Sequence, residues 1–244
     1  MLSKRLIKYF KSLQLKKYRM QERKFLVEGA KGVAELLKSD LDIEYLLLTA
    51  DFRSELEAEL SLRGEVLEVT EKELVQVGTF QSNNAGLAVA VMPEEAALAI
   101  GEQELVLALD DIRDPGNLGT IIRIADWYGI TKVICSKECA DVYNPKVVNA
   151  SMGSFTRVQV WYEELGDFLK QADQTVYGAL LEGENIYQSQ LKPSGILLMG
   201  NESKGIQPDL IPLITQPVHI PRRGGAESLN VSVATAVILD NFFR

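Results

Sequence analysis

Short apolar segments alternate with helical patterns along most of the chain, and this alternation limits the fold more than any other feature. From residue 104 onward the predicted strands are 104–110, 132–136, 157–162, 175–181, 195–199 and 217–221. Strands that alternate with helices form a mostly parallel sheet covered by helices on both faces. The ligands of such sheets bind at the carboxyl ends of the strands.

A smaller unit of the same kind precedes residue 93. Its predicted strands are 24–29, 43–50, 65–70 and 85–92. Its predicted helices are 30–39, 53–64 and 71–78, the last of them capped by Thr70. We therefore divide the chain into four parts, which are a basic N-terminal segment (1–24), a small α/β domain (25–92), a linker (93–103) and a larger α/β domain (104–244).

The charge is distributed unevenly along the chain. Residues 1–24 contain nine Lys or Arg and one acidic residue, a net charge of +8, whereas the remaining 220 residues carry −16. A basic segment on an acidic body is typical of a phosphate-binding region. An alternative is an amphipathic helix that buries Leu6, Tyr9, Phe10 and Leu13, and the two interpretations are compatible.

Several classes of function are disfavoured by what the chain lacks. No run of about 18 apolar residues predicts a membrane span, and the N-terminus lacks the apolar core of a secretory signal. Cys135 and Cys139 have no second pair or nearby histidine, so we expect reduced thiols, no metal site and a cytoplasmic protein. No dinucleotide-binding or Walker A motif is present, and His219, the only histidine, lies inside a predicted strand.

The first loop of chemical interest follows strand 104–110 and leads into an apolar helix that contains Arg123. Asn117 is predicted to cap this helix. On a helix, Arg123 shares one side with Gly119, Asp126 and Trp127, and a glycine one turn earlier lets a ligand approach the guanidinium. The alternative is a surface pair between Arg123 and Asp126.

Two further loops of this kind follow later strands. Strand 195–199 ends at Gly200 and is followed by Asn201 and Glu202, which could also form an ordinary polar turn. Strand 217–221 is followed by an Arg-Arg-Gly-Gly sequence, which can bind phosphate through its guanidinium and backbone N–H groups. Ser228 is predicted to cap the last helix, whereas Asn230 has no evident local role.

Together these loops resemble the three motifs of the SpoU (TrmH-like) family of RNA 2′-O-ribose methyltransferases, within the SPOUT class. The matching segments are DPGNLGTIIRIADWYGI (114–130), LLMGNESKGI (197–206) and Ile220-Pro221 followed by GGAESLNVSVATA (224–236). Residues 144–154 also resemble a family segment, and 25–37 is similar to the small RNA-binding domain of many members. Arg222 stands where the family usually has Met, and Asn149 where Arg is expected.

The resemblance implies a trefoil-knotted, parallel-sheet methyltransferase domain preceded by a small α/β RNA-binding domain, and a homodimer. It implies S-adenosylmethionine as cofactor, and the implied cofactor-binding residues are Met199, Gly200, Ile220, Leu229 and Asn230. The implied catalytic residues are Asn117, Arg123, Glu202, Ser228 and Asn230. The expected reaction is methylation of a ribose 2′-hydroxyl in structured RNA, either rRNA or tRNA.

Within this resemblance we assign roles from chemistry. Arginine keeps its proton in proteins, so we expect Arg123 to hold a phosphate and to stabilise the developing alkoxide. Asn117, Ser228 and Asn230 are expected to orient ribose and cofactor, and Glu202 to anchor Arg123 or its loop. The alternatives are a non-catalytic RNA-binding or ribosome-assembly protein on the same fold and an unrelated α/β nucleotide-binding enzyme.

Overall fold

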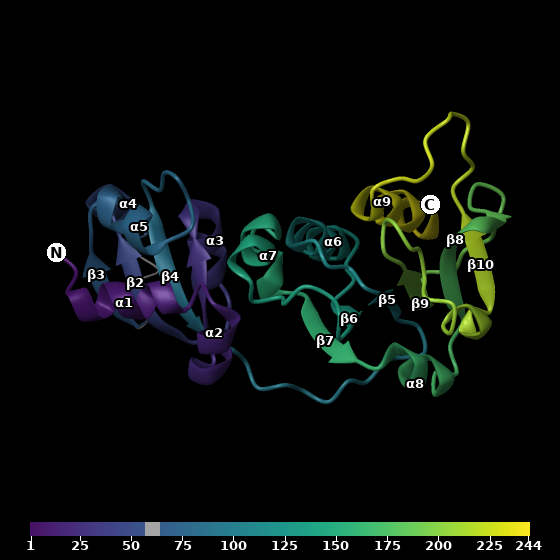
Figure 1. Cartoon of the computed structure of the whole chain (residues 1–244), viewed down its shortest axis with the longest axis horizontal. Coiled ribbons are helices and arrows are strands. Elements are labelled where there is room, and N and C mark those ends of the chain that lie inside the picture. Colours follow the sequence, from purple (N-terminus) through teal and green to yellow (C-terminus); the bar gives the residue numbers. More distant parts are fainter. Residues whose placement is uncertain (57–63) are drawn as a thin grey trace. The chain divides into compact units, whose positions relative to one another are not determined.

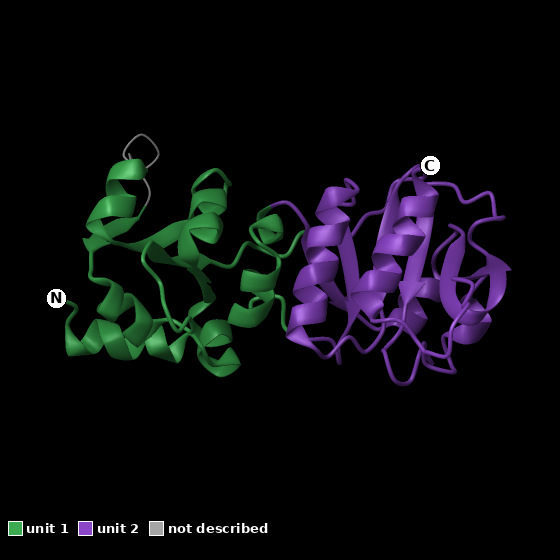
Figure 2. Cartoon of the chain, turned by 90° about the horizontal axis from the view of Figure 1, so that it is seen from above, with its two compact units in different colours: residues 1–96, 141–156 green, residues 97–140, 157–244 purple. Residues whose placement is uncertain are grey.

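The computed structural model describes residues 1–56 and 64–244, which form two compact units (Figure 2). Unit 1 comprises Met1–Ala96 and Asp141–Thr156, and unit 2 comprises Ala97–Ala140 and Arg157–Arg244. The segment Asp141–Thr156 thus belongs to unit 1 although the chain on both of its sides belongs to unit 2. The chain therefore passes between the units three times.

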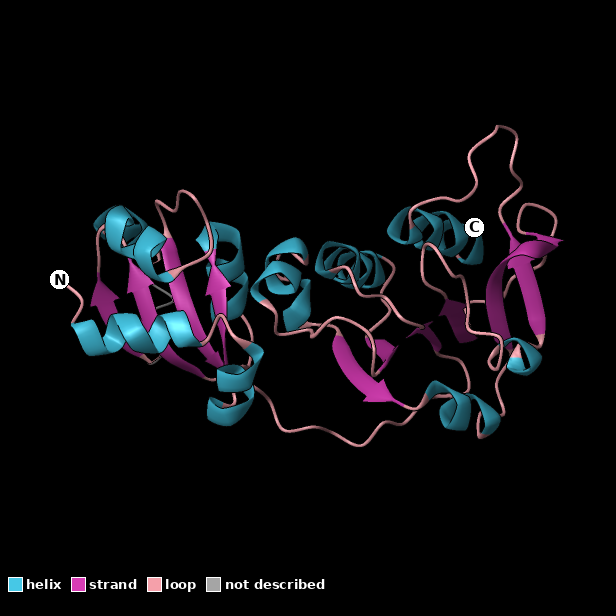
Figure 3. Cartoon of the chain, viewed as in Figure 1, coloured by secondary structure: helices cyan, strands magenta, loops and turns pink. Residues whose placement is uncertain are grey.

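Unit 1 is a four-stranded sheet with helices on both faces (Figures 1 and 3). The sheet order is β1-β4-β2-β3, with β1 (Lys24–Glu28), β2 (Ile43–Leu48), β3 (Glu65–Glu68) and β4 (Gly86–Val91). β4 runs antiparallel to β1 and β2, and β2 runs parallel to β3. The helices are α1 (Lys4–Ser12), α2 (Lys16–Glu22), α3 (Gly29–Leu37), α4 (Ala50–Glu55), α5 (Glu71–Val77) and α7 (Pro145–Ala150), and η1 (Ser154–Thr156) is a short 3-10 turn.

Alternation along the strands of unit 1 produces two hydrophobic cores, one on each face of the sheet. In β1, Phe25 and Val27 belong to the core that also holds α3, Phe52 of α4 and Val148 of α7. Leu26 belongs to the opposite core, which contains residues of α1 and α5. Thr70 caps α5 in a reciprocal arrangement with Glu73, as predicted. α4 covers the start of the predicted helix 53–64. Residues 57–63 of that predicted helix lie outside the described residues.

The basic segment 1–24 is part of the core of unit 1. Phe10 and Leu13 are fully buried there, so the expected amphipathic helix is confirmed. Arg19 is also buried, at 2% exposure, and its guanidinium donates to Asp141 Oδ2 at 2.6 Å and to the Leu13 carbonyl at 3.1 Å. This buried ion pair ties α2 to the segment that is inserted from later in the sequence.

Unit 2 contains the predicted parallel sheet (Figures 1 and 3). Its order is β10-β8-β9-β5-β6-β7, with all described pairings parallel. The strands are β5 (Leu105–Leu109), β6 (Lys132–Ser136), β7 (Gln159–Glu163), β8 (Val176–Asn185), β9 (Gly195–Met199) and β10 (Gln216–His219). The bounds of β6 and β9 agree with those predicted, and the others differ by one to four residues at an end.

Helices cover both faces of this sheet. α8 (Leu165–Lys170) buries Leu165 and Leu169 in a core with β5, β8 and β9. α6 (Pro115–Trp127) and α9 (Val231–Phe242) pack against each other, and the Phe242 ring meets Tyr177 of β8 edge to face. A short 3-10 turn, η2 (Ile211–Leu213), precedes β10.

For the described residues, the sequence predicts no membrane span, no metal site, free cysteines and a histidine within a strand. None of their helices combines the length and hydropathy needed to cross a bilayer. Likewise, no group of three or more His, Cys, Asp or Glu side chains in 1–56 and 64–244 is arranged to hold a metal ion. Cys135 and Cys139 are buried free thiols, and His219 lies at the end of β10 with its Nδ1 2.8 Å from the Gly183 carbonyl oxygen.

Candidate active site

The site is built on two neighbouring strands of unit 2. Leu109, the last residue of β5, is opposite Met199, the last residue of β9, and the Asp110 N–H donates to the Met199 carbonyl at 2.8 Å. The loops that follow both strands therefore start side by side at the carboxyl edge of the sheet. These are the first two of the three loops singled out in the sequence.

Helix α6 begins differently from the prediction. Asp114, not Asn117, is the N-cap, and its Oδ1 accepts from the Asn117 N–H at 2.8 Å. Pro115 occupies the first helical position, where its missing N–H and fixed φ cost nothing. The helix therefore begins at Pro115, and the capping residue is the one directly before it, Asp114. The Asn117 side chain is consequently free to make contacts outside its own helix.

Asn117 connects residues from all three loops. Its amide nitrogen donates to Glu202 Oε1, and its amide oxygen accepts from Asn230 Nδ2 at 2.9 Å. A carboxylate can only accept, so Glu202 determines which way the Asn117 amide faces, and Asn117 in turn determines the orientation of Asn230. The three side chains form an oriented chain of hydrogen bonds.

The far end of this chain is the start of α9. Asn230 Oδ1 accepts from the N–H groups of Ser232 at 3.0 Å and Val233 at 3.4 Å, so Asn230 is the helix cap. The prediction that Ser228 caps α9 is therefore wrong, because the amide oxygen of Asn230 reaches the free N–H groups of the first turn. Ser228 and Leu229 are exposed.

Arg123 lies on the exposed side of α6. The opposite side of the helix is buried, with Ile121 and Ile122 inaccessible to solvent, as the helical spacing predicts. The alternative pair with Asp126 does not form, because Asp126 binds Arg157 at 2.8 Å. Among the described residues, Arg123 has no ion-pair or side-chain hydrogen-bond partner. The structure shows Glu202 in contact with Asn117 rather than with Arg123.

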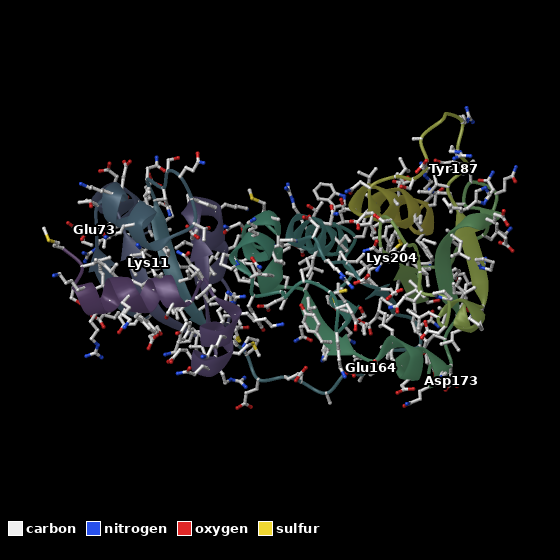
Figure 4. The ribbon with its side chains drawn as sticks, in the orientation of Figure 1. Lys11, Glu73, Glu164, Asp173, Tyr187 and Lys204 are labelled. Atoms are coloured by element: carbon white, nitrogen blue, oxygen red, sulfur yellow. The ribbon has the colours of Figure 1, made fainter. Side chains whose placement is uncertain are left out.

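The loop after β9 is a tight hairpin. Asn201 and Gly205 exchange backbone hydrogen bonds at 3.0 and 2.8 Å, and the Asn201 side chain donates to the Asp111 carbonyl at 2.8 Å. Gly200 is packed against this hairpin, since a Cβ there would lie 2.3 Å from Gly205 C and Ile206 N. The glycine at position 200 is thus required by the chain's own backbone. Figure 4 labels Lys204 in this hairpin.

Asp110 is a buried residue of the site that the sequence analysis did not single out. Its side chain has no exposed surface, and its two oxygens accept from Gln207 N at 2.7 Å and Gln207 Nε2 at 2.6 Å. Burial raises the pKa of the Asp110 carboxyl above its ordinary value, and the two hydrogen bonds from Gln207 oppose this rise. The available signal was a pair of acids directly after an otherwise apolar strand.

Backbone groups near the site are available to a ligand. Within the described part of the chain, the backbone groups of Gly200, Ile220 and Leu229 make no backbone hydrogen bond outside the regular helix and strand pairings. Met199 is buried, at 2% exposure, whereas Leu229 is 47% exposed. N–H and carbonyl groups at such positions can bind the edge of an adenine. The residues present therefore fit a nucleoside cofactor.

The third loop contributes positive charge. Arg222 donates to the Ala226 carbonyl at 3.2 Å, and Arg222 and Arg223 are both exposed. A Cβ on Gly224 or Gly225 would meet no atom within 4 Å, so these glycines are not required by packing. The loop is therefore open to solvent and carries two exposed guanidinium groups, which can bind phosphate.

Comparisons with known proteins agree with this geometry. Residues 104–240 match the SpoU rRNA Methylase family, and residues 4–88 match the MRM3-like substrate binding domain. The chain is 32% identical over 237 residues to the 23S rRNA (guanosine(2553)-2′-O)-methyltransferase RlmP of Bacillus subtilis (strain 168), covering 96% of this chain and 94% of that protein.

Two solved structures are similar over nearly the whole chain. A TrmH-family protein from Porphyromonas gingivalis has a TM-score of 0.88 and 37% identity, with 99% of this chain and 98% of that chain covered. An AdoMet-bound rRNA methyltransferase from Sinorhizobium meliloti has a TM-score of 0.87 and 30% identity, with 99% and 95% covered. The chain belongs to the SpoU rRNA methylase family, and its activity is S-adenosylmethionine-dependent methylation of a ribose 2′-hydroxyl in RNA.

Proposed function

We propose that the target of this enzyme is a guanosine of 23S rRNA and that the enzyme acts in the cytoplasm. The observation that carries the proposal is the similarity to the Bacillus subtilis enzyme, which extends over 96% of the chain and so includes both units. Ribose methylation should be mapped at nucleotide resolution in RNA from cells with and without this protein. Loss of one guanosine methylation in 23S rRNA is expected, and a loss confined to tRNA would contradict the proposal.

The two units divide the work in this proposal. Unit 2 performs methyl transfer, and unit 1 binds RNA. Support for the second part is the match of residues 4–88 to a substrate-binding domain, together with a basic surface on α1 and α2. This basic surface consists of the exposed residues Lys4, Arg5, Lys8, Lys11, Lys16, Lys17 and Arg23. Figure 4 labels Lys11 on α1. In this division of work the RNA-binding part is unit 1 as the structure has it, with 1–96 and 141–156, and the methyltransferase part is 97–140 and 157–244.

The cofactor site in this proposal lies where the three loops meet. Met199, Gly200, Ile220, Leu229 and Asn230 would hold the adenosine and methionine parts, mainly through backbone groups. S-adenosylmethionine, when bound, supplies a methyl group on a sulfonium. Transfer of this group needs no metal, only an aligned 2′-hydroxyl, removal of its proton and a site for the adjacent phosphate.

We assign to Arg123 the binding of the phosphate beside the reacting ribose. Its guanidinium is exposed and unpaired among the described residues, so it can form two parallel hydrogen bonds with a phosphate. Asn117 lies six residues earlier on α6, about 9 Å along the helix axis. The oriented chain Glu202–Asn117–Asn230 holds the start of α9. Ser228 lies two residues before Asn230, and we assign to its hydroxyl the orientation of the ribose. In this role Arg123 stabilises the alkoxide electrostatically.

The decisive test is Arg123→Ala. Methyl transfer to a 23S rRNA transcript should fall at least about 100-fold, the size of effect seen when one preorganised electrostatic donor is removed. The Kd for S-adenosylmethionine, measured by calorimetry, should stay within about twofold. Arg244→Ala is the matched control, because Arg244 is an exposed arginine of the same unit that pairs with Asp240.

Two results would contradict the assignment of Arg123. One is near-normal turnover of the folded variant, and the other is loss of cofactor binding by that variant. A wild-type protein that binds both RNA and cofactor without transferring a methyl group would instead favour the non-catalytic RNA-binding alternative.

Two further properties of the family belong to the proposal. The C-terminal part of unit 2 forms a trefoil knot, with the last helix threaded through a preceding loop, and two copies of the chain form a dimer. Support for a dimer comes from large apolar side chains exposed on and beside the packed helices α6 and α9, namely Trp127 (84%), Val233 (50%) and Leu229 (47%). Sedimentation should show a dimer for the wild type and a monomer for Trp127→Lys.

A further inference from the structure

Unit 1 contains a cavity of about 220 Å³ that none of the residues assigned above lines. Its walls come from the end of β1, the first turn of α3, the turn after α5, and α7 with the residue pair that follows it. The side chains of Val27, Val148, Phe80 and Met152 make it mainly apolar, and Asn149 and Lys31 contribute polar groups.

Phe80 is held at this cavity by a buried carboxylate. Glu28, only 4% exposed, accepts from the Thr79 N–H at 2.9 Å, the Thr79 hydroxyl at 2.6 Å and the Phe80 N–H at 3.3 Å. Gly29 has a φ of +83°, and a Cβ there would lie 3.1 Å from the Phe80 ring. A buried acid and a glycine therefore fix the place of one aromatic side chain.

The opposite wall has two features that packing alone does not require. In the described part of the chain, the Asn149 side-chain amide has no hydrogen-bond partner, although the residue is half-buried. Met152 has a φ of +53° and is 44% exposed. A left-handed conformation is costly for a non-glycine residue, and such strain gathers at functional sites.

The chemistry of the lining suits a nucleobase. A base presents two apolar faces, which stack on aromatic and aliphatic side chains, and a polar edge, which a side-chain amide can read with one donor and one acceptor. Lys31, whose side chain is 59% exposed, also lines the cavity and is paired with Glu35 at 2.8 Å. Its ammonium can donate to a phosphate attached to the base when it leaves Glu35.

We propose that this cavity binds one unstacked base of the RNA substrate, with Phe80 as the stacking surface and Asn149 as the group that reads its edge. The proposal rests on RNA being the substrate bound by unit 1. It gives a role to Asn149 itself, because its side-chain amide can hydrogen-bond a base edge as both donor and acceptor.

The test measures RNA affinity and cofactor affinity in the same full-length variants. The RNA probe is a 23S rRNA transcript that the wild type methylates. Phe80→Leu and Asn149→Ala should each raise the Kd for this RNA about tenfold, the effect expected from loss of one stacked base or its edge contact. Phe80→Tyr, which keeps the aromatic surface, should remain within about twofold of the wild type.

Controls separate a binding role from a structural one. Gln81→Ala changes the exposed neighbour of Phe80 and should leave RNA affinity unchanged. The Kd for S-adenosylmethionine and the thermal transition should match the wild type in Phe80→Leu and Asn149→Ala. If either variant loses cofactor binding together with RNA binding, the cavity is structural and the proposal is overturned.

The proposal and the RNA assignment fail in different ways. A wild type that binds cofactor but no rRNA transcript refutes the RNA target, whichever variant is used. A wild type that binds and methylates the transcript, with Phe80→Leu and Asn149→Ala binding it equally well, refutes only the base-binding cavity.

Discussion

Each unit of the molecule has a buried carboxylate at the carboxyl end of a strand, Glu28 in unit 1 and Asp110 in unit 2, and these two carboxylates serve different loops. Glu28 is the last residue of β1 and holds the turn that contains Thr79 and Phe80. Asp110 follows β5 and holds Gln207, at the end of the hairpin after β9. In both cases the acid accepts from the backbone N–H and from a side-chain donor of the same residue, Thr79 or Gln207, and Glu28 also accepts from the Phe80 N–H.

The difference lies in what each loop presents. The turn held by Glu28 faces the cavity to which we assign an RNA base, whereas the hairpin held by Asp110 packs against Gly200 of the proposed cofactor site and contains Glu202, a proposed catalytic residue. A buried acid here is an anchor whose accepting oxygens fix a loop, because a loop lacks the regular hydrogen bonds of a helix or sheet. The comparison predicts that changes in unit 1 affect RNA binding and that changes at Asp110 affect cofactor binding.

The largest expected effect separating the two acids is that of Asp110→Ala. Without an acceptor for Gln207 the hairpin loses its anchor, so the Kd for S-adenosylmethionine should rise at least about tenfold, or about 1.4 kcal/mol. Asp110→Asn should restore most of the affinity, because the Gln207 amide can rotate to accept from the new amide group. Calorimetry measures both. Asp209→Ala, an exposed acid of the same loop, is the control. Unchanged affinity in a folded Asp110→Ala protein would remove the parallel between the two acids.

The corresponding change in unit 1 is Glu28→Gln. One carboxylate oxygen is replaced by an NH2 group that faces the donors of Thr79, so the turn should shift and carry Phe80 with it. We expect a Kd for the 23S rRNA transcript about fivefold higher, with the cofactor Kd unchanged. Weaker cofactor binding in this variant, measured by the same calorimetry, would show that the two anchors are not independent.

The basic surface of unit 1 provides a smaller and less local effect. Lys8 and Lys11 lie on the exposed side of α1, and replacing both by Gln should flatten the slope of log affinity against log salt by about 1.4 for single-stranded RNA. Affinity near physiological salt should fall about threefold. Filter binding at several salt concentrations measures the slope. An unchanged slope would show that RNA does not reach α1. Deleting residues 1–24 is not a clean test, because Phe10, Leu13 and Arg19 belong to the core.

The smallest effect concerns the stability of unit 2 as the pH changes. The folded pKa of Asp110 is raised, so the folded state holds this proton more tightly than the unfolded chain, whose Asp has a pKa of about 3.9. The associated stability is present below that value and is lost as the pH rises through the folded pKa. Asp110→Asn carries no such charge, so its melting temperature relative to the wild type should increase across this range. Thermal melts at a series of pH values measure the difference in melting temperature between Asp110→Asn and the wild type. A difference that stayed constant with pH would contradict a raised pKa of Asp110 in the folded protein.

The sequence was sufficient for the framework of both units and for the choice of the three loops. Strand 195–199 is a continuous apolar run, and 132–136 contains the apolar run 133–135 between Lys132 and Ser136, which is the pattern of buried parallel strands. The Thr70 cap was predictable because the reciprocal Glu73 stands three residues later. These features depend on neighbours in the sequence.

The predictions that failed depend either on competition between neighbouring capping residues or on contacts between residues far apart in the sequence. Asn117 and Ser228 are good capping residues in isolation, but Pro115 and Asn230 decide where α6 and α9 begin. Asp110 gave little signal because its partner, Gln207, is 97 positions away. The membership of 141–156 in unit 1 depends on contacts such as the Phe25 and Tyr143 rings, whose centroids lie 4.7 Å apart.

The inserted segment also sets the order in which the protein can fold as it is synthesised. Domains commonly fold one after another from the N-terminus as the chain leaves the ribosome. Here the first 96 residues lack Tyr143, Val148 and Phe155, which complete one core of unit 1, and Asp141, which neutralises buried Arg19. Unit 1 therefore cannot finish folding until residue 156 has emerged, by which time β5 and β6 of unit 2 have already been made. Unit 1 can therefore complete its folding only after part of unit 2 has been synthesised, and before the rest of unit 2 has been made.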